Sequence, residues 1–219
     1  MGDIPAWAGA RDPVPPPRRL GIYGGSFDPV HRGHLFVAHD VRVSFALDRV
    51  VLVPANRSPF KPDAGASGAQ RIEMVRLAIN GLPWADASDV ELGRPAPSYT
   101  VDTLRHFREC LPDTELFLIV GADTLTDFAG WRDPDGILDL ATLIAVARPG
   151  STLGFPRTLA KLIAQRQTRI VLHQTDSHDT SSREVRARVR EGLPVAGHVP
   201  EMVARYILEC GLYREPQDK

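Results

Sequence analysis

Two histidines three residues apart, beside a pair of glycines, are the side chains in this sequence best suited to chemistry on an anion. They belong to the stretch GGSFDPVHRGH, which starts at Gly24. Gly24 and Gly25 let the backbone turn tightly and approach a ligand closely. A helix that starts after them would add outward amides and the positive end of its dipole. Ser26, His31 and His34 can donate hydrogen bonds to phosphate oxygens, so the stretch predicts an anion-binding loop.

The same histidines have other interpretations. They could be surface residues without a function, or part of a metal site that includes Asp28 or His39. Zinc takes three or four nitrogen, sulfur or oxygen ligands, and a full set is not evident in the sequence, so we expect no dedicated metal site. The sequence contains no GxxxxGK[ST] P-loop, and no GxGxxG follows the first predicted strand, which argues against two better-known phosphate loops.

Strands and helices that alternate along the chain must position this loop. Short apolar runs predict strands at 20–24, 49–54, 88–92, 115–120, 142–147 and 169–173. Helical spacing of apolar residues predicts helices at 34–47, 69–80, 101–110, 156–165, 182–191 and 200–210, and a further helical stretch from Ala122, with a polar loop at 130–135. This alternation indicates an α/β fold, a Rossmann-like doubly wound parallel sheet with helices on both faces and C-terminal helices.

Composition narrows the class of protein. The 219 residues are 43% hydrophobic, enough for one sizeable core, so we expect a flexible leader at 1–18, a single domain at 19–214 and a tail at 215–219. A net charge of −1 gives no basic field for nucleic acid. We find no apolar run of the roughly 20 residues that a membrane span needs and no signal-peptide core. Cys110 and Cys210 have no zinc-ligand spacing, and we expect two buried, reduced thiols in a cytoplasmic protein.

Four later segments carry candidate binding groups, and three of them lie in loops after predicted strands, at the edge where parallel sheets bind ligands. Lys61 in NRSPFKPD is a flexible cation that could reach a phosphate, or a solvated surface residue. In PSYTVDTL, Ser98 is a candidate helix cap. In GADTLTDFAGW, Asp123 could bind a ribose hydroxyl or cap a helix, and Trp131 could stack on a ring or pack in the core. In TSSREVR, the serines at the helix start and Arg186 one turn later could bind phosphate.

Taken in order, these five segments resemble the bacterial nicotinate-nucleotide adenylyltransferases of the HxGH nucleotidylyltransferase superfamily, and the resemblance runs from Leu20 to Tyr213. It implies an enzyme that transfers AMP from ATP to nicotinate mononucleotide, giving nicotinate adenine dinucleotide and pyrophosphate, with Mg²⁺ carried mainly by the nucleotide and water. The implied catalytic residues are His31, His34 and Arg186. The implied ATP-binding residues are Gly24, Gly25, Ser26, Phe27, His31, His34, Gly121, Asp123, Ser181, Ser182 and Arg186. The implied mononucleotide-binding residues are Lys61, Ser98, Tyr99, Thr100, Trp131 and Arg132.

The sequence departs from the family pattern at a few positions. Ser58 and Phe60 stand where the family has proline and histidine, so we assign Phe60 no catalytic role. Arg183 replaces a threonine in TSSREVR and adds a cation that strengthens phosphate binding or faces solvent.

Three alternative functions stay open at this point. One is a sister enzyme whose acceptor is phosphopantetheine or nicotinamide mononucleotide. A second is a fragment of a class I aminoacyl-tRNA synthetase, which the short chain and the net charge of −1 disfavour. A third is a non-enzymatic nucleotide-binding module on the same fold, because fold does not dictate function. The oligomeric state is left open.

Overall fold

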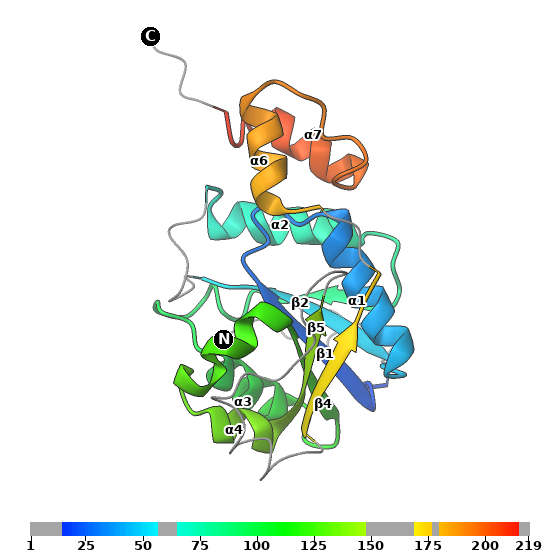
Figure 1. Ribbon diagram of the computed structural model, residues 1–219, viewed down its shortest axis with the longest axis vertical. Coiled ribbons are helices and arrows are strands. Elements are labelled where there is room, and N and C mark those ends of the chain that lie inside the picture. The colour runs from blue at the N-terminus through cyan, green and yellow to red at the C-terminus, as the bar shows by residue number, and fades with distance from the viewer. Residues whose placement is uncertain (1–14, 57–64, 148–168, 177–179, 215–219) are drawn as a thin grey trace.

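Six parallel strands form one sheet across the middle of the molecule (Figure 1). The computed structural model describes residues 15–56, 65–147, 169–176 and 180–214. Within these ranges the strands are β1 (Arg19–Gly25), β2 (Arg49–Pro54), β3 (Ala85–Ala87), β4 (Glu115–Gly121), β5 (Ala141–Ala147) and β6 (Ile170–Gln174), in the sheet order β3-β2-β1-β4-β5-β6. The predicted α/β fold with a parallel sheet is therefore confirmed.

The direction in which the sheet grows reverses at β1. This strand pairs with β2 from Leu20–Arg49 to Gly25–Pro54, and with β4 from Arg19–Glu115 to Tyr23–Ile119. Ligands of doubly wound sheets bind at the carboxyl ends of the strands where this reversal occurs. The loop after β1 and the turn after β4 both lie at that point.

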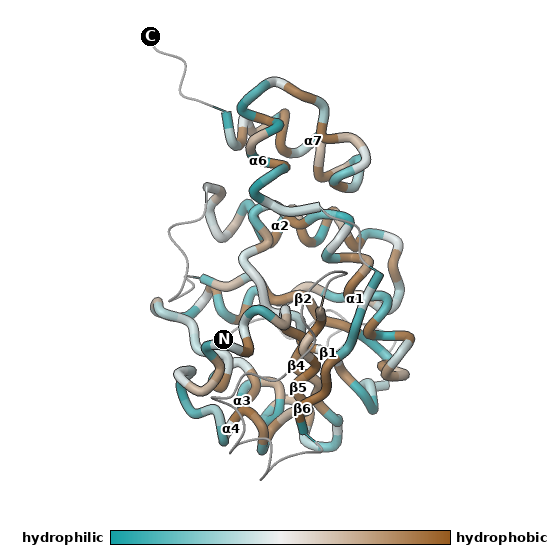
Figure 2. The backbone as a smooth tube through the Cα atoms, in the orientation of Figure 1, coloured by the Kyte–Doolittle hydropathy of each residue, from teal (hydrophilic) through white to brown (hydrophobic). Residues whose placement is uncertain are grey.

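Helices cover both faces of the sheet. They are α1 (Arg32–Ser44), α2 (Gly68–Ile79), α3 (Thr100–Cys110), the 3₁₀ helix η2 (Ala122–Gly130), α4 (Pro134–Leu140), α6 (Ser182–Arg190) and α7 (Glu201–Glu209). Alternate residues of a strand face opposite sides of a sheet. In β2, Val50 and Leu52 pack under α1 and α2, while Val51 and Val53 pack under α3 and α4. Figure 2 shows the central strands as the most apolar part of the chain.

The two last helices extend one of these layers. Val203 and Ile207 of α7 are buried in the core that also holds Met74 and Val75 of α2. In Figure 1, α6 and α7 lie together beyond α2, at one end of the molecule. This packing brings the last described residues back towards the loop after β1.

Several predicted elements differ from the observed ones. The strand predicted at 88–92 is wrong: β3 comes earlier, paired to β2 through Val50 and Ala85, and the amide of Leu92 bonds back to Asp89 in a turn. Helix α1 starts at Arg32 rather than at residue 34. The loop predicted at 130–135 contains the start of α4, whose first residue is a proline preceded by an Asp cap. The helix predicted at 156–165 lies outside the described residues.

The cysteines also differ from the prediction. Cys110 is half-buried and Cys210 is exposed, and both are free thiols. In the described part of the chain, no helix is both long and apolar enough to span a membrane.

Candidate active site

The two histidines of the first loop close the start of α1 as a reciprocal capping box. The Nδ1 atom of His31, the N-cap residue, accepts from the His34 amide at 3.3 Å, and the Nδ1 atom of His34 accepts from the His31 amide at 3.2 Å. The rings stack with centroids 3.6 Å apart. Since Nδ1 accepts in both rings, the proton of each neutral imidazole sits on Nε2. The spacing of three residues therefore sets the tautomer of both rings as well as their position.

Small residues leave room for these rings. A Cβ atom added to Gly33 would lie 3.1 Å from two atoms of the His31 ring. One added to Gly25 would lie 3.1 Å from the ring of Phe27, whose own φ is 47°. The Phe27 ring in turn contacts the His34 ring edge to face, with centroids 5.0 Å apart. The glycines thus permit a tight loop in which the Phe27 ring packs against His34.

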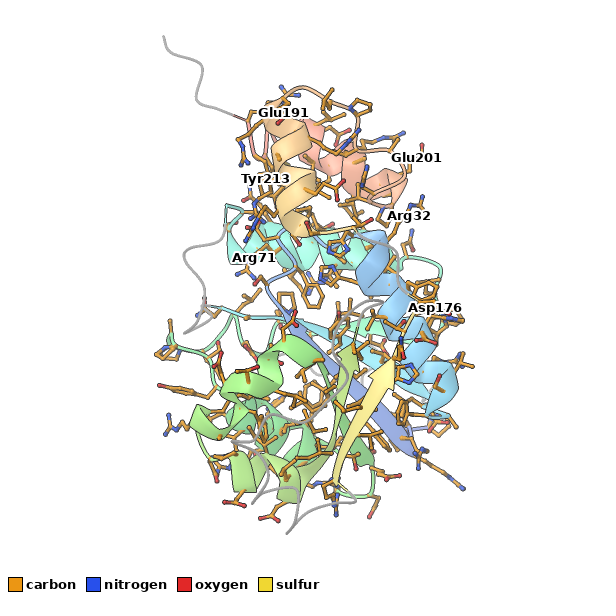
Figure 3. The ribbon with its side chains drawn as sticks, in the orientation of Figure 1. Arg32, Arg71, Asp176, Glu191, Glu201 and Tyr213 are labelled. Carbon is orange, nitrogen blue, oxygen red and sulfur yellow. The ribbon has the colours of Figure 1, made fainter. Side chains whose placement is uncertain are left out.

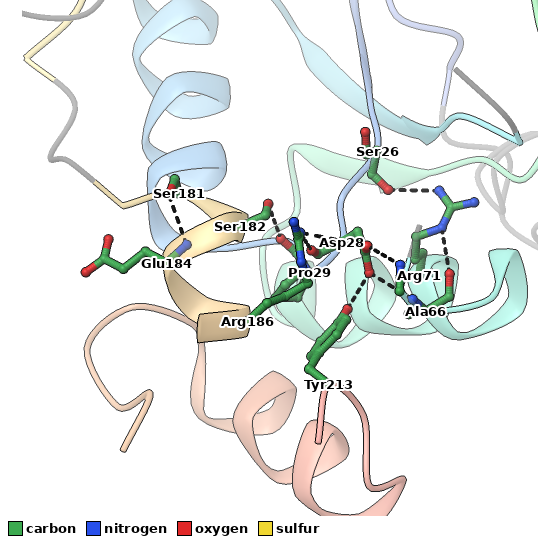
Figure 4. A network of polar contacts seen from close by, with 11 residues as sticks. Ser26, Asp28, Pro29, Ala66, Arg71, Ser181, Ser182, Glu184, Arg186 and Tyr213 are labelled. Atoms are coloured by element: carbon green, nitrogen blue, oxygen red, sulfur yellow. Dashed lines mark hydrogen bonds and ion pairs between the residues drawn. The ribbon is translucent and has the colours of Figure 1, made fainter. Parts of the chain in front are cut away.

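The start of α6 lies directly against this loop. Ser181 is the N-cap of α6, and its Oγ accepts from the Glu184 amide at 3.1 Å. The Ser182 hydroxyl donates to the carbonyl oxygen of Pro29 at 2.9 Å, and Arg186 Nη1 donates to the carbonyl oxygen of Asp28 (Figure 4). The first loop and the segment TSSREVR, both of which the resemblance assigns to ATP binding, are therefore in contact.

Asp28 joins several segments of this site, a role that the sequence did not indicate. Its side chain is only 4% exposed. The carboxylate accepts from the amides of Gly65 at 2.7 Å and Ala66 at 3.1 Å, and from the hydroxyl of Tyr213 at 2.6 Å. The same carboxylate lies 3.8 Å from Arg186 Nη1. An acidic residue inside a glycine-rich loop was the available signal, but its partners are far away in the sequence.

A buried arginine supports the loop from the side of α2. Arg71 is 2% exposed, and its guanidinium donates to the carbonyl oxygens of Ser26 at 2.8 Å and Ala66 at 3.3 Å. Burial lowers the pKa of Arg71, and the charge of Asp28 opposes this effect. Burial and the hydrogen bond to Asp28 raise the pKa of Tyr213. Figure 3 shows Arg71 on α2 and Tyr213 after α7 on the same side of the molecule.

The turn after β4 lies at the neighbouring strand end. Gly121 is the exposed N-cap of η2, and its carbonyl oxygen accepts from the Thr124 hydroxyl at 2.6 Å. Asp123 is exposed in the first turn of η2 and does not cap the helix. Because β4 pairs with β1, this turn and the glycine pair of the first loop lie along one edge of the sheet.

A second group of predicted residues comes together at the start of α3. The N-cap of α3 is Tyr99 and no side chain caps the helix, so the predicted cap by Ser98 is wrong. The guanidinium carbon of Arg132 lies 4.6 Å from the centroid of the Tyr99 ring. Trp131 is half-buried and packs on Phe128 with centroids 5.3 Å apart. The structure thus joins the segments PSYT and GW, which the sequence separates.

Glu91 lies beneath this second group and was not identified from the sequence. It is 8% exposed, and Oε1 accepts from the Thr103 hydroxyl at 2.8 Å. Arg94 reaches the same Thr103 hydroxyl, and Asn56 donates to the carbonyl oxygen of Arg94. Burial raises the pKa of Glu91, an effect opposed by the hydroxyls of Thr103 and Ser98. The network ties the segment before α3 to the end of β2.

The two remaining candidates are Lys61 and the metal site considered from the sequence. Lys61 lies outside the described residues. Within the described ranges, no three His, Cys, Asp or Glu side chains gather as metal ligands. Asp28 has both carboxylate oxygens in hydrogen bonds, and His39 is exposed with its ring against Trp84. The half-built metal site considered from the sequence is therefore not assembled from these two residues.

Comparison with known proteins shows the family to which this chain is similar and supports its fold. The model of the cytidylyltransferase-like family matches residues 22–188. A nicotinate-nucleotide adenylyltransferase of Roseiflexus castenholzii is 41% identical over 90% of this chain and 98% of its own, and one of Thermus thermophilus is 43% identical over 90% and 100%. The solved Plasmodium falciparum nicotinic acid mononucleotide adenylyltransferase, complexed with NaAD, has a TM-score of 0.72 at 19% identity, over 90% of this chain and 97% of that one.

Proposed function

The chain belongs to the cytidylyltransferase-like family and, within it, to the nicotinate-nucleotide adenylyltransferases, and we propose that the loop after β1 and the start of α6 hold the triphosphate of its ATP. The reaction transfers AMP from ATP to nicotinate mononucleotide and gives nicotinate adenine dinucleotide and pyrophosphate, a step of NAD biosynthesis. The observation that carries the residue assignment is that the loop with the two stacked histidines contacts the start of α6 through Pro29 and Ser182, at the switch point of the sheet.

The reaction requires the two substrates to be positioned and the negative charge of the transition state to be neutralised. The attacking 5′-phosphate of the mononucleotide is already an anion, so the reaction needs no strong general base. Catalysis then depends on in-line placement and on donors aimed at the charge of the transition state. We assign His34 to the α-phosphate, because its Nδ1 is held by the His31 amide and Nε2 carries the proton.

The remaining donors fit the β- and γ-phosphates. The Ser182 hydroxyl donates to Pro29, so its contribution to phosphate comes from the amides at the α6 terminus, where the helix dipole is positive. Arg186 uses one nitrogen on the loop carbonyl and has further N–H groups for a phosphate oxygen. His31 is 2% exposed and stacks beneath His34, so its main contribution is to hold that ring.

The start of α3 fits the nicotinate end of the acceptor. Its uncapped N-terminus offers backbone amides near Thr100 to a carboxylate. The half-buried Trp131 offers a face to the pyridine ring, and the exposed Arg132 adds a cation beside Tyr99. Selection of the acid over the amide would follow from the positive potential of these groups.

The side chains and amides assigned to the triphosphate are hydrogen-bond donors and would not ligate a metal ion. They are consistent with a magnesium ion that the nucleotide itself carries. Mg²⁺ keeps several waters and binds through few protein carboxylates when phosphates are present. Asp28, the carboxylate within the loop, has both oxygens in hydrogen bonds within the protein. When bound, the ion would neutralise charge on the triphosphate. We propose that the enzyme acts in the cytoplasm on these free nucleotides, without nucleic acid or membrane.

A pyrophosphate-release assay with ATP and a panel of acceptors tests the proposal. Nicotinate mononucleotide should give the fastest release, with nicotinamide mononucleotide slower and phosphopantetheine inactive. Faster release with another acceptor would make the chain a sister enzyme. ATP binding without release for any acceptor would favour a nucleotide-binding module.

A further inference from the structure

The Asp28 carboxylate joins four segments of the chain behind the triphosphate loop. It lies in the loop after β1, and it accepts hydrogen bonds from the amides of Gly65 and Ala66 just before α2. Tyr213, after α7, donates its hydroxyl at 2.6 Å. Arg186 of α6 lies 3.8 Å away and donates to the carbonyl oxygen of Asp28 itself (Figure 4).

The four contacts divide between the two carboxylate oxygens. Oδ2 takes the Gly65 amide and faces Arg186, while Oδ1 takes the Ala66 amide and the Tyr213 hydroxyl. The Tyr213 bond is the shortest of the hydrogen bonds to this carboxylate. Each donor constrains the rotation of the carboxylate plane, so the Tyr213 hydroxyl limits how closely Oδ2 can approach the guanidinium of Arg186.

The packing of the chain around Tyr213 holds its hydroxyl within reach of the Asp28 carboxylate. Its ring is half-buried, and a Cβ atom added to Gly65 would lie 3.2 Å from it. Leu212 is buried in the core shared by α2 and α7. Tyr213 has φ 63°, a backbone conformation that non-glycine residues rarely adopt. The end of α7 is thereby anchored so that one phenol hydroxyl reaches the loop.

We propose that Tyr213 is a positioning residue for ATP: its hydroxyl orients the Asp28 carboxylate, which holds the Arg186 guanidinium between the loop carbonyl and the triphosphate. Without that hydroxyl, Oδ1 keeps only the Ala66 amide and the carboxylate turns to pair closely with Arg186. A close ion pair would draw the guanidinium away from the phosphates, and the carboxylate would offset its positive charge. This inference rests on the proposed role of Arg186 in binding ATP.

The variant Tyr213→Phe tests the role because it keeps the ring and removes only the hydroxyl. We expect the KM for ATP to rise about tenfold, the size expected for one hydrogen bond to a charged group, while the KM for nicotinate mononucleotide stays within about twofold. Tyr206→Phe is the matched control, since it removes a phenol hydroxyl from α7 itself, and it should leave both KM values unchanged. Equal rises in both KM values, or none, would overturn the proposal.

A double-mutant cycle separates this role from general support of the fold and from the proposed function. In an Arg186→Gln background, Tyr213→Phe should no longer change the KM for ATP, because its effect passes through the guanidinium. A full additional tenfold rise there would assign Tyr213 a purely structural role and refute the inference. If Arg186→Gln alone left ATP kinetics at wild type, the proposed function of Arg186 would fail instead. Thermal unfolding of each variant checks that the protein assayed is folded.

Discussion

Replacing His34 by alanine separates the catalytic and structural parts of the capping box. The change removes the Nδ1 atom that accepts from the His31 amide at 3.2 Å and the ring that stacks on His31. It also removes the Nε2 donor that we assign to the α-phosphate. Two effects of different size should follow, and they can be measured independently.

The structural effect should be small. Loss of one capping hydrogen bond costs about 1 kcal/mol, and loss of one stacked ring pair adds about 1 kcal/mol. The catalytic effect should be larger. Removing one preorganised donor to the transition state lowers kcat by about 10²- to 10³-fold, or about 2.7–4 kcal/mol.

The chain contains a matched control at the start of α2. There Ser67 and Gln70 form the same kind of capping box, in which the Ser67 amide donates to Gln70 Oε1 at 2.9 Å. Gln70→Ala therefore removes an equivalent hydrogen bond and should cost about 1 kcal/mol of stability. It should leave kcat unchanged.

Single-turnover release of pyrophosphate gives the chemical rate, and urea unfolding gives the stability. A folded His34→Ala protein with a kcat near wild type would refute the assignment of His34 to the transition state. A loss of activity as large in Gln70→Ala would show that helix capping, and not phosphate binding, explains the result.

Three further results are expected from the site and its surroundings. Arg186→Lys keeps the charge but loses the planar fork of donors, so the KM for ATP should rise about tenfold in steady-state assays; an unchanged KM would contradict the phosphate contact. Trp131→Ala should raise the KM for nicotinate mononucleotide about tenfold and leave that for ATP unchanged, as loss of ring stacking predicts, and an effect on ATP alone would be incompatible with this role. Burial raises the pKa of Glu91, because the folded protein disfavours its charged form. The stability of the fold should therefore fall as the pH rises above about 4.3, the pKa of glutamate in the unfolded chain. Glu91→Gln should therefore stabilise the protein at pH 7 and lose this advantage below about pH 4. Urea unfolding at both pH values that shows no difference would argue against a raised pKa of Glu91.

The strands and the first loop were predictable because their signals are local. The β-branched runs at β2 and β4 mark buried strands, and five of the six predicted strands overlap observed ones. The strand predicted at 88–92 failed for a physical reason. Val90 and Glu91 are buried by a turn, and burial alone does not distinguish a turn from a strand. The three residues of β3 are set by pairing with β2, which a pattern along one segment does not reveal.

The cap at α3 failed for a related reason. Ser98 has the chemistry of an N-cap, but the helix starts one residue later than that role requires, and the hydroxyl lies towards the buried Glu91. Glu91, Thr103 and Arg94 form a network across a turn and a helix. Charged residues are seldom buried unless they are paired, so no pattern along the chain could place Glu91 inside.

The capping box of the first loop follows from local spacing, whereas the contacts that hold this loop in place depend on how distant helices pack. His31 and His34 meet because an N-cap and the third helical residue are always neighbours in one turn. Asp28 meets Tyr213 across 185 positions of the chain, because α7 packs on α2 and returns the chain to the loop. The sequence therefore determines the contacts within a turn. Contacts between distant segments arise only in the tertiary structure, since they depend on which apolar faces bury one another.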